Sequence, residues 1–241
     1  MKLEIGYNFP FEIRKETHQS NCNDDFSILF LSDLHFNGFN KTKVYEIIKK
    51  IEELNPTIIL FGGDYIDSNK GLIQLKLLLL SLSHRKNLFA IAGNHDYFFG
   101  IDKIKECMEA NNVFWLEKRS FTFQINNTTI RIVGNLLKTE EKEFDFSILV
   151  LHNPKAIDNL KDHHHSAFAG HLHGCQFVFW ENKNGLYPGK FFYKWNTLKA
   201  MKDDCQFFIS KGLGDTLPIR FNCKRDMIFL QVNGIQDRII F

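Results

Sequence analysis

The stretch Leu60-Phe61-Gly62-Gly63-Asp64 is a short apolar run that stops abruptly at a carboxylate. Four other groups of polar residues also stop apolar runs, one before this stretch and three after it. These groups are Asp33-Leu34-His35, Asn94-His95-Asp96, His152 and His171-Leu172-His173. Because short, wholly apolar runs are typical of strands that are buried on both faces, we expect each polar group at the end of a strand.

The first half of the chain repeats one pattern three times: an apolar run, a polar group and a helical periodicity. The runs are 26–31, 57–61 and 88–92, and the helical patterns are 41–54, 71–83 and about 101–110. This repetition is typical of βαβ units and predicts a parallel sheet. In such sheets the ligand site lies beyond the carboxyl ends of the strands, where the first three polar groups fall.

The second half has a different pattern. Residues 120–125 and 128–133 predict a hairpin about Asn126-Asn127. Further strands are expected at 146–151, 167–169, 176–180, 205–209 and 227–232. Because no repeat or linker separates the halves, we expect residues 1–241 to form a single domain in which a second sheet packs on the first, with helices outside.

The composition is ordinary for a folded protein, with 44% hydrophobic and 24% charged residues among 241. A net charge of +2 is too small to indicate a nucleic-acid partner. The five cysteines form no C-x-x-C pair, which favours a reducing compartment over a disulfide framework. With no signal-like apolar segment at the start, we expect a cytoplasmic protein, either soluble or resting on the inner face of the membrane.

The polar groups contain ligands that suit transition metals. Asp33 and His35 are two residues apart, as are His171 and His173, so in an extended backbone each pair points to one side. Carboxylate, imidazole and amide oxygen together suit Mn, Fe or Zn better than Ca. A lone carboxylate at Asp64 can bridge two ions, which are then about 3.5–4 Å apart, as in sites for phosphoryl displacement.

Each group alone has another interpretation. Asp33 could cap a helix, Asn94 and Asp96 could form a turn, and His152 could lie in a loop. Their joint occurrence favours the metal site. The tract 163–165, three consecutive histidines, is expected to be a solvated loop, because adjacent side chains point in different directions.

Asp-x-His, Gly-Asp, Gly-Asn-His-Asp, His and Gly-His-x-His, in this order, resemble the calcineurin-like metallophosphoesterase superfamily. The resemblance spans roughly residues 26–180 and implies an α/β fold, a four-layer αββα sandwich of two mixed sheets flanked by helices. It also implies two divalent metal ions, with Mn favoured. One ion would bind Asp33, His35, Asp64 and His173, and the other Asp64, Asn94, His152 and His171.

The resemblance further implies that His95 acts on the phosphate, as a leaving-group acid or a stabiliser of the transition state. Asp96 would then orient the imidazole of His95.

Residues 208–214 and 217–222 resemble a bacterial branch of membrane-associated phosphoesterases that includes some UDP-2,3-diacylglucosamine pyrophosphatases of lipid A synthesis. Two residues depart from that branch: Cys175 stands where Gly is usual, and Lys211 where Arg is usual. Ser68 stands where phosphoprotein phosphatases often carry Arg, which disfavours that activity.

Residues 185–202 interleave aromatic residues with Lys. This segment is either a flap whose aromatic side chains lie in the core, or an interfacial patch that admits an acyl chain. The second alternative makes Phe191 and Trp195 candidate substrate contacts, together with Arg220 from the branch motif.

The sequence therefore predicts a dinuclear-metal phosphohydrolase that cleaves a phosphodiester or pyrophosphate bond. The expected substrate is phosphorylated and lipid-linked, such as UDP-2,3-diacylglucosamine, with peripheral membrane contact and no nucleic acid. The alternatives are a soluble nucleotide phosphodiesterase and a non-catalytic scaffold of the same fold. The sequence leaves the oligomeric state open.

Overall fold

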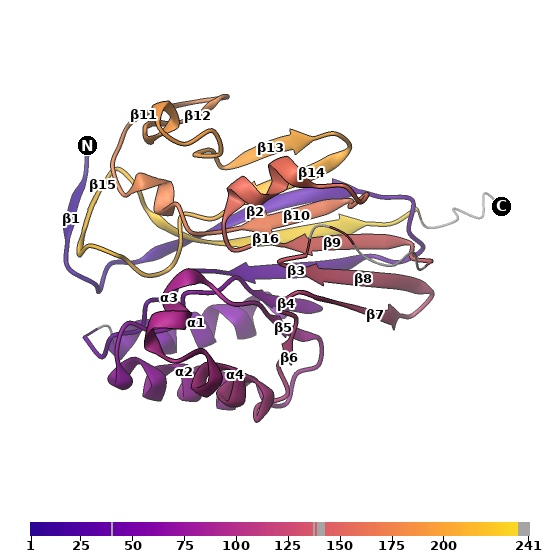
Figure 1. Cartoon of the computed structure of the whole chain (residues 1–241), viewed down its shortest axis with the longest axis horizontal. Coiled ribbons are helices and arrows are strands. Elements are labelled where there is room, and N and C mark those ends of the chain that lie inside the picture. Colours follow the sequence, from indigo (N-terminus) through magenta and orange to yellow (C-terminus); the bar gives the residue numbers. More distant parts are fainter. Residues whose placement is uncertain (40, 137, 139–142, 236–241) are drawn as a thin grey trace.

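The computed structural model describes residues 1–39, 41–136, 138 and 143–235. Two six-stranded sheets pack face to face, and the α-helices gather on the outer side of one of them (Figure 1).

The first sheet has the order β2-β16-β3-β4-β5-β6. Its strands are β2 (Phe11–Gln19), β16 (Arg225–Asn233), β3 (Phe26–Leu31), β4 (Ile58–Phe61), β5 (Leu88–Ala90) and β6 (Phe114–Trp115). β3, β4, β5 and β6 run parallel, and β16 joins β3 antiparallel and β2 parallel, so the sheet is mixed.

Side chains of the central strand β3 alternate between two cores, as the two-residue period of a strand requires. Leu29 and Leu31 pack toward α1 (Lys41–Leu54), α2 (Asn69–Leu82) and α4 (Ile101–Glu109). Ile28 and Phe30 pack toward the second sheet instead. The strand is apolar throughout because both of its faces are covered.

The second sheet has the order β13-β14-β10-β9-β8-β7. Its strands are β13 (Lys199–Lys202), β14 (Cys205–Ile209), β10 (Ser166–Ala169), β9 (Phe146–Val150), β8 (Thr128–Gly134) and β7 (Arg119–Ile125). The hairpin β7–β8 has the predicted register about residues 126 and 127. The four central strands β14, β10, β9 and β8 are parallel neighbours, and both edge strands are antiparallel.

Short elements surround the end of the molecule at which the parallel strands finish. They are β1 (Leu3–Ile5), α3 (Asn94–Phe99), η1 (Pro154–Asn159), η2 (His173–Cys175), β11 (Val178–Asn182), β12 (Gly185–Pro188), η3 (Gly189–Phe191) and β15 (Ile219–Phe221). β1 pairs with β15, and β11 pairs with β12.

The predicted α/β fold of two mixed sheets flanked by helices is confirmed. The layer outside the second sheet differs in kind from the layer outside the first. In the described part of the chain it consists of the 3-10 helix η1 and the segment around Trp195, which pack on Phe207 and Ile209. The connection from β9 to β10 is short, and η1 is the helix that it contains. No helix among the described residues is both long and apolar enough to cross a membrane.

The prediction that residues 163–165 form a solvated loop is wrong for the middle histidine. His164 is 1% exposed, and its Nδ1 lies 2.9 Å from the Ser147 hydroxyl oxygen. Burial, followed by the nearby Arg131 charge, lowers the pKa of His164 to about 3. His18 is also buried, and its Nδ1 lies 3.2 Å from the hydroxyl oxygen of Ser166.

Candidate metal centre

The five polar groups meet at one end of the two sheets. Each follows the carboxyl end of a parallel strand, so the two sheets bring them together from opposite sides. The first sheet supplies Asp33, His35, Asp64 and Asn94, and the second supplies His152, His171 and His173.

Asp33, His35 and His173 form one potential ligand group, in which one atom from each residue lies within 4.8 Å of the others. His173 Nε2 is 3.5 Å from Asp33 Oδ1 and 3.3 Å from His35 Nε2. All three residues are buried, so their polar atoms need partners.

Asp64, His152 and His171 form a second group with the same spacing. His152 Nε2 is 3.3 Å from Asp64 Oδ2 and 2.9 Å from the amide oxygen of Asn94. The rings of His152 and His171 meet edge to face at 5.0 Å.

Asp64 lies between the two groups. Its Oδ2 is 3.3 Å from His152 Nε2 and 3.8 Å from His35 Nε2. One carboxylate oxygen thus faces an imidazole of each group, which is the position that a bridging ligand requires. Bridging itself stays a prediction.

The ring nitrogens that point away from the centre are also bonded. His35 Nδ1 is 2.8 Å from the Asp67 carboxylate, and His152 Nδ1 is 2.9 Å from the carbonyl oxygen of Gly62. When Nδ1–H donates to these acceptors, the lone pair of Nε2 faces the centre and is available to a metal. The donor set and its outer hydrogen bonds therefore fit divalent transition-metal ions.

Several ligand candidates have left-handed backbone conformations, which are uncommon for residues other than Gly and are concentrated at functional sites. The φ angles are 54° at Asp33, 41° at His35, 56° at Asp64, 73° at His171 and 51° at His173. The strand ends therefore turn sharply at the ligands themselves.

Two glycines allow the chain to approach the carboxylates. A Cβ atom at Gly93 would lie 2.1 Å from Asp64 Oδ1, and one at Gly170 would lie 2.2 Å from Asp33 Oδ2. Any larger residue at either position would displace a ligand candidate.

The charges of Asp64 and His152 stabilise each other. Burial raises the pKa of Asp64, but the hydrogen bond and charge of His152 outweigh this effect and bring the pKa to about 2. Burial also lowers the pKa of His152, and contact with Asp64 outweighs it, so that this pKa rises to about 9. Protons therefore compete with a metal ion for His152.

Asp96 does not orient His95, contrary to the prediction. Its carboxylate is fully buried and accepts the backbone N–H groups of Asp64, Tyr65 and Gly93 at 2.9, 2.9 and 2.7 Å. These bonds connect the start of α3 to the loop that follows β4. Asp96 therefore fixes the backbone at Asp64.

The carboxylate beside His95 belongs to Asp67, which the sequence analysis did not select as a site residue. Asp67 Oδ1 lies 3.5 Å from His95 Nδ1 and 2.8 Å from His35 Nδ1. A signal was available, since Asp67 follows Asp64 by three residues in the Gly-Asp-x-x-Asp pattern.

Arg220, predicted to contact substrate, is completely buried. Its guanidinium donates to Asp215 at 2.6 Å and to the carbonyl of Gly214 at 2.7 Å, and it lies 3.3 Å from His173 Nδ1. The substrate-contact prediction is therefore wrong for Arg220, which supports the loop behind a ligand candidate.

The two aromatic candidates differ. Trp195 is 8% exposed and packs edge to face on Phe207, whereas Phe191 is 69% exposed and contacts the rings of Tyr187 and Trp180. Trp195 therefore belongs to the core behind the second sheet, as the flap alternative predicts. Phe191 stays a candidate for contact with a ligand.

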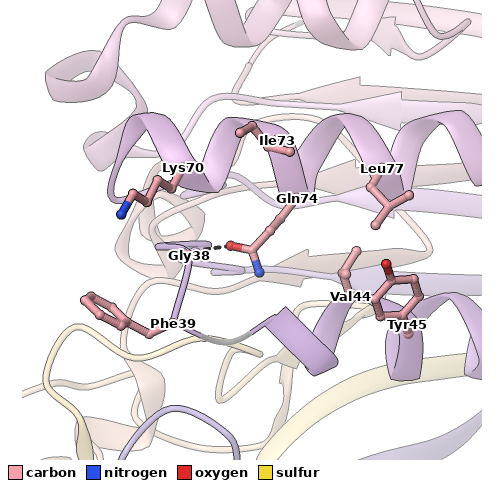
Figure 2. Close-up of a pocket in the computed structure, with 8 residues that line it drawn as sticks. All are labelled: Gly38, Phe39, Val44, Tyr45, Lys70, Ile73, Gln74 and Leu77. Atoms are coloured by element: carbon pink, nitrogen blue, oxygen red, sulfur yellow. Dashed lines mark hydrogen bonds between the residues drawn. The ribbon is translucent and has the colours of Figure 1, made fainter.

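One hollow of the described surface lies away from this centre. It is a groove of about 670 Å³ between α1 and α2, lined by apolar residues such as Val44 and Ile73 (Figure 2). The Gly38 N–H donates to Gln74 Oε1 at 2.8 Å across it (Figure 2). Because none of the ligand groups lines the groove, its size does not make it the reaction site.

Comparison with known proteins identifies the family. A model of calcineurin-like phosphoesterases matches residues 26–205, a span that contains both ligand groups. The chain belongs to this family.

Curated relatives are similar over most of the chain. Phosphodiesterase YaeI of Escherichia coli is 26% identical over 86% of this chain and 82% of its own length. An uncharacterized metallophosphoesterase of Helicobacter pylori is 23% identical over 86% of this chain, which spans 60% of that relative's length.

Among solved structures, the calcineurin-like phosphoesterase YfkN of Bacillus subtilis is similar with a TM-score of 0.51. It is 14% identical and is matched over 79% of this chain and 82% of that one. At this identity the likeness concerns the fold alone.

Proposed function

We propose that this chain, as a single domain, hydrolyses a phosphodiester or pyrophosphate bond with two divalent metal ions, Mn²⁺ favoured. The observation that carries the proposal is the position of Asp64, whose Oδ2 faces His35 and His152 at 3.8 and 3.3 Å. Asp33 and His173 complete one ligand set, and Asn94 and His171 complete the other.

Two ions held in this way supply Lewis-acid charge for the phosphoryl oxygens and an activated water. The protein contributes the placement of its ligands. The Asp67 carboxylate and the Gly62 carbonyl orient His35 and His152 through Nδ1. The three backbone bonds of Asp96 hold the Asp64 loop in register with α3.

His95 is the residue that we propose as leaving-group acid. Its side chain is 30% exposed at the edge of the centre, so it can meet a substrate oxygen. Its backbone N–H donates to Asp64 Oδ1 at 2.8 Å, and its ring packs edge to face on His35 at 4.9 Å. The Asp67 carboxylate lies 3.5 Å from His95 Nδ1, where it can orient the imidazole.

The proposed substrate is lipid-linked, such as UDP-2,3-diacylglucosamine. Exposed aromatic rings support this proposal, because side chains of this kind suit the boundary of a lipid headgroup region. The rings belong to Phe179, Trp180 and Phe191, which are 49–69% exposed. We propose peripheral contact at the cytoplasmic face of a membrane, in keeping with the five free cysteines.

A soluble nucleotide phosphodiesterase is the second candidate. It is favoured by the exposed Lys155, which lines the same cavity as His171 and can contact a phosphate. A non-catalytic scaffold is disfavoured because every predicted metal ligand is present.

The test is hydrolysis by the full chain with Mn²⁺, Fe²⁺ or Zn²⁺. The panel contains UDP-2,3-diacylglucosamine, bis(p-nitrophenyl) phosphate, cyclic nucleotides and phospholipids. The proposal expects turnover of the chromogenic diester and a kcat/KM at least tenfold higher for the lipid-linked substrate. A higher kcat/KM for cyclic nucleotides than for the lipid-linked substrate would favour the nucleotide phosphodiesterase. A protein that binds metal but hydrolyses none of these substrates would favour the scaffold.

A further inference from the structure

A smaller cavity adjoins the metal centre. Its volume is about 460 Å³, and it lies between η1 and the segment that follows η3. The ligand candidate His171 forms part of its wall. The other residues used below are Lys155, Asp158, Phe192, Tyr193 and Lys194, which also line it.

The cavity carries positive charge. Lys155 is exposed at η1 and forms no ion pair with any residue that the structure describes. Lys194 pairs with Asp158, and its ammonium also lies 4.8 Å from the ring centre of Trp195. The lining therefore contains one carboxylate and two ammonium groups, and Lys155 is available for another anion.

The cavity also presents flat rings to solvent. Phe192 is 79% exposed and Tyr193 is 52% exposed, whereas Trp195 next to them is buried. The buried indole anchors the segment on the second sheet, so the two exposed rings are held beside His171. Large rings left in water next to a reaction centre are typical of a ligand site.

We propose that this cavity binds the ring-bearing, anionic half of the substrate, a group with the chemistry of a nucleoside monophosphate. The inference rests on the proposed function, since the scissile phosphorus would lie at the metal centre next to His171. A base or sugar would stack on Phe192 or Tyr193, and Lys155 would contact the phosphate that it carries.

An acyl chain fits this cavity poorly. Lys155, Asp158 and Lys194 would lose water on contact with a chain and gain no hydrogen bond in return. The cavity therefore selects the polar half of an amphipathic substrate, and acyl chains must lie elsewhere.

The test measures binding of uridine 5′-monophosphate to the Mn²⁺-loaded full chain by calorimetry. Ribose 5-phosphate and inorganic phosphate serve as truncated probes. We expect the nucleotide to bind about tenfold more tightly than ribose 5-phosphate, because stacking of a base on an aromatic ring adds about that much. Equal affinity for all three probes would overturn the proposal.

Two variants locate the site. Phe192→Ala should remove most of the advantage of the nucleotide over ribose 5-phosphate, and Lys155→Glu should weaken nucleotide binding about 3- to 10-fold. Lys161→Glu, the same charge change at an exposed residue just beyond η1, is the matched control and should bind like the wild type. Equal affinities of Lys155→Glu and Lys161→Glu would show that the nucleotide binds elsewhere.

Binding and turnover report on separate claims. If the chain hydrolyses no phosphodiester, the proposed function fails, but calorimetry still tests the cavity. If the chain hydrolyses the chromogenic diester and does not bind the nucleotide, only the cavity proposal fails.

Discussion

The metal centre and the aromatic segment 185–202 are built in opposite ways. The centre collects side chains, most of them buried, from the ends of parallel strands in both sheets. The aromatic segment is continuous in sequence, contains one 3-10 turn, and leaves several large rings in solvent. The strand ends are fixed by hydrogen-bonded ladders, whereas the segment after η3 is anchored by buried side chains such as Trp195.

This difference implies that the metal centre carries out the reaction and that the aromatic segment affects which substrate is bound. Ligands for neighbouring ions must be held within a few tenths of an ångström, which strand ends can do. A surface that recognises the rest of a substrate can lie on a loop that tolerates change. We therefore expect substitutions at the centre to remove turnover with every substrate, and exposed substitutions in the segment to change the choice among substrates.

Asp64→Ala should have the largest effect. Loss of the carboxylate between the two ligand groups should release both ions and abolish turnover with every substrate. Metal content by mass spectrometry and hydrolysis of bis(p-nitrophenyl) phosphate are the measurements. Asp102→Ala, at an exposed position of α4, is the control. An Asp64→Ala protein that still carries two ions would refute the bridging role.

His95→Ala should lower kcat by about 10²–10⁴-fold, the usual size of a general-acid contribution, without loss of metal. Asp67→Asn should reproduce part of this loss, because it removes the negative charge 3.5 Å from His95 Nδ1. His84→Ala is the matched control, since that ring is 61% exposed and remote from the ligand groups. Release of metal by His95→Ala would mean that its role is structural.

Trp195→Ala should lower the free energy of unfolding by about 3 kcal/mol, because a large buried ring leaves a cavity. Phe191→Ala should change it by less than about 0.5 kcal/mol, since that ring is 69% exposed. Urea denaturation measures both values. Equal stability losses in the two variants would contradict the conclusion that Trp195 is a buried anchor and Phe191 an exposed side chain.

His164 should make the second sheet sensitive to acid. Its pKa is about 3 in the native state and about 6.5 in the unfolded chain, so below pH 6.5 the unfolded state binds the additional proton. Stability should therefore fall as the pH decreases from 6.5 toward 3, by up to about 1.4 kcal/mol per pH unit. Urea midpoints at several pH values measure the slope.

His164→Gln should flatten that slope, and His163→Gln, at the exposed neighbouring position, should leave it unchanged. A slope that is the same in wild type and His164→Gln would assign the acid sensitivity to other groups.

The sequence predicted the strands that carry the ligands because each is an apolar run with a polar end. Asp33, Asp64 and His152 were all selected in this way, and the structure places each of them in one of the two ligand groups. The sequence did not predict the role of a residue where that role depends on the direction of its side chain. Asp96 and Asp67 both lie near His95 in sequence or in space, and only Asp67 turns its carboxylate toward the imidazole.

The amino-acid order by itself determined the fold class and the set of metal-ligand candidates, because apolar periodicity and residue type are local properties. Tertiary structure decided which side chains are buried, as at Arg220, His164 and Trp195. It also decided which cavity adjoins the reaction centre, since His171 and Lys155 meet only when η1 packs on the second sheet. The burial of a side chain and the meeting of residues at one site depend on contacts between segments that are distant in sequence. Apolar periodicity is a local pattern and does not predict such contacts.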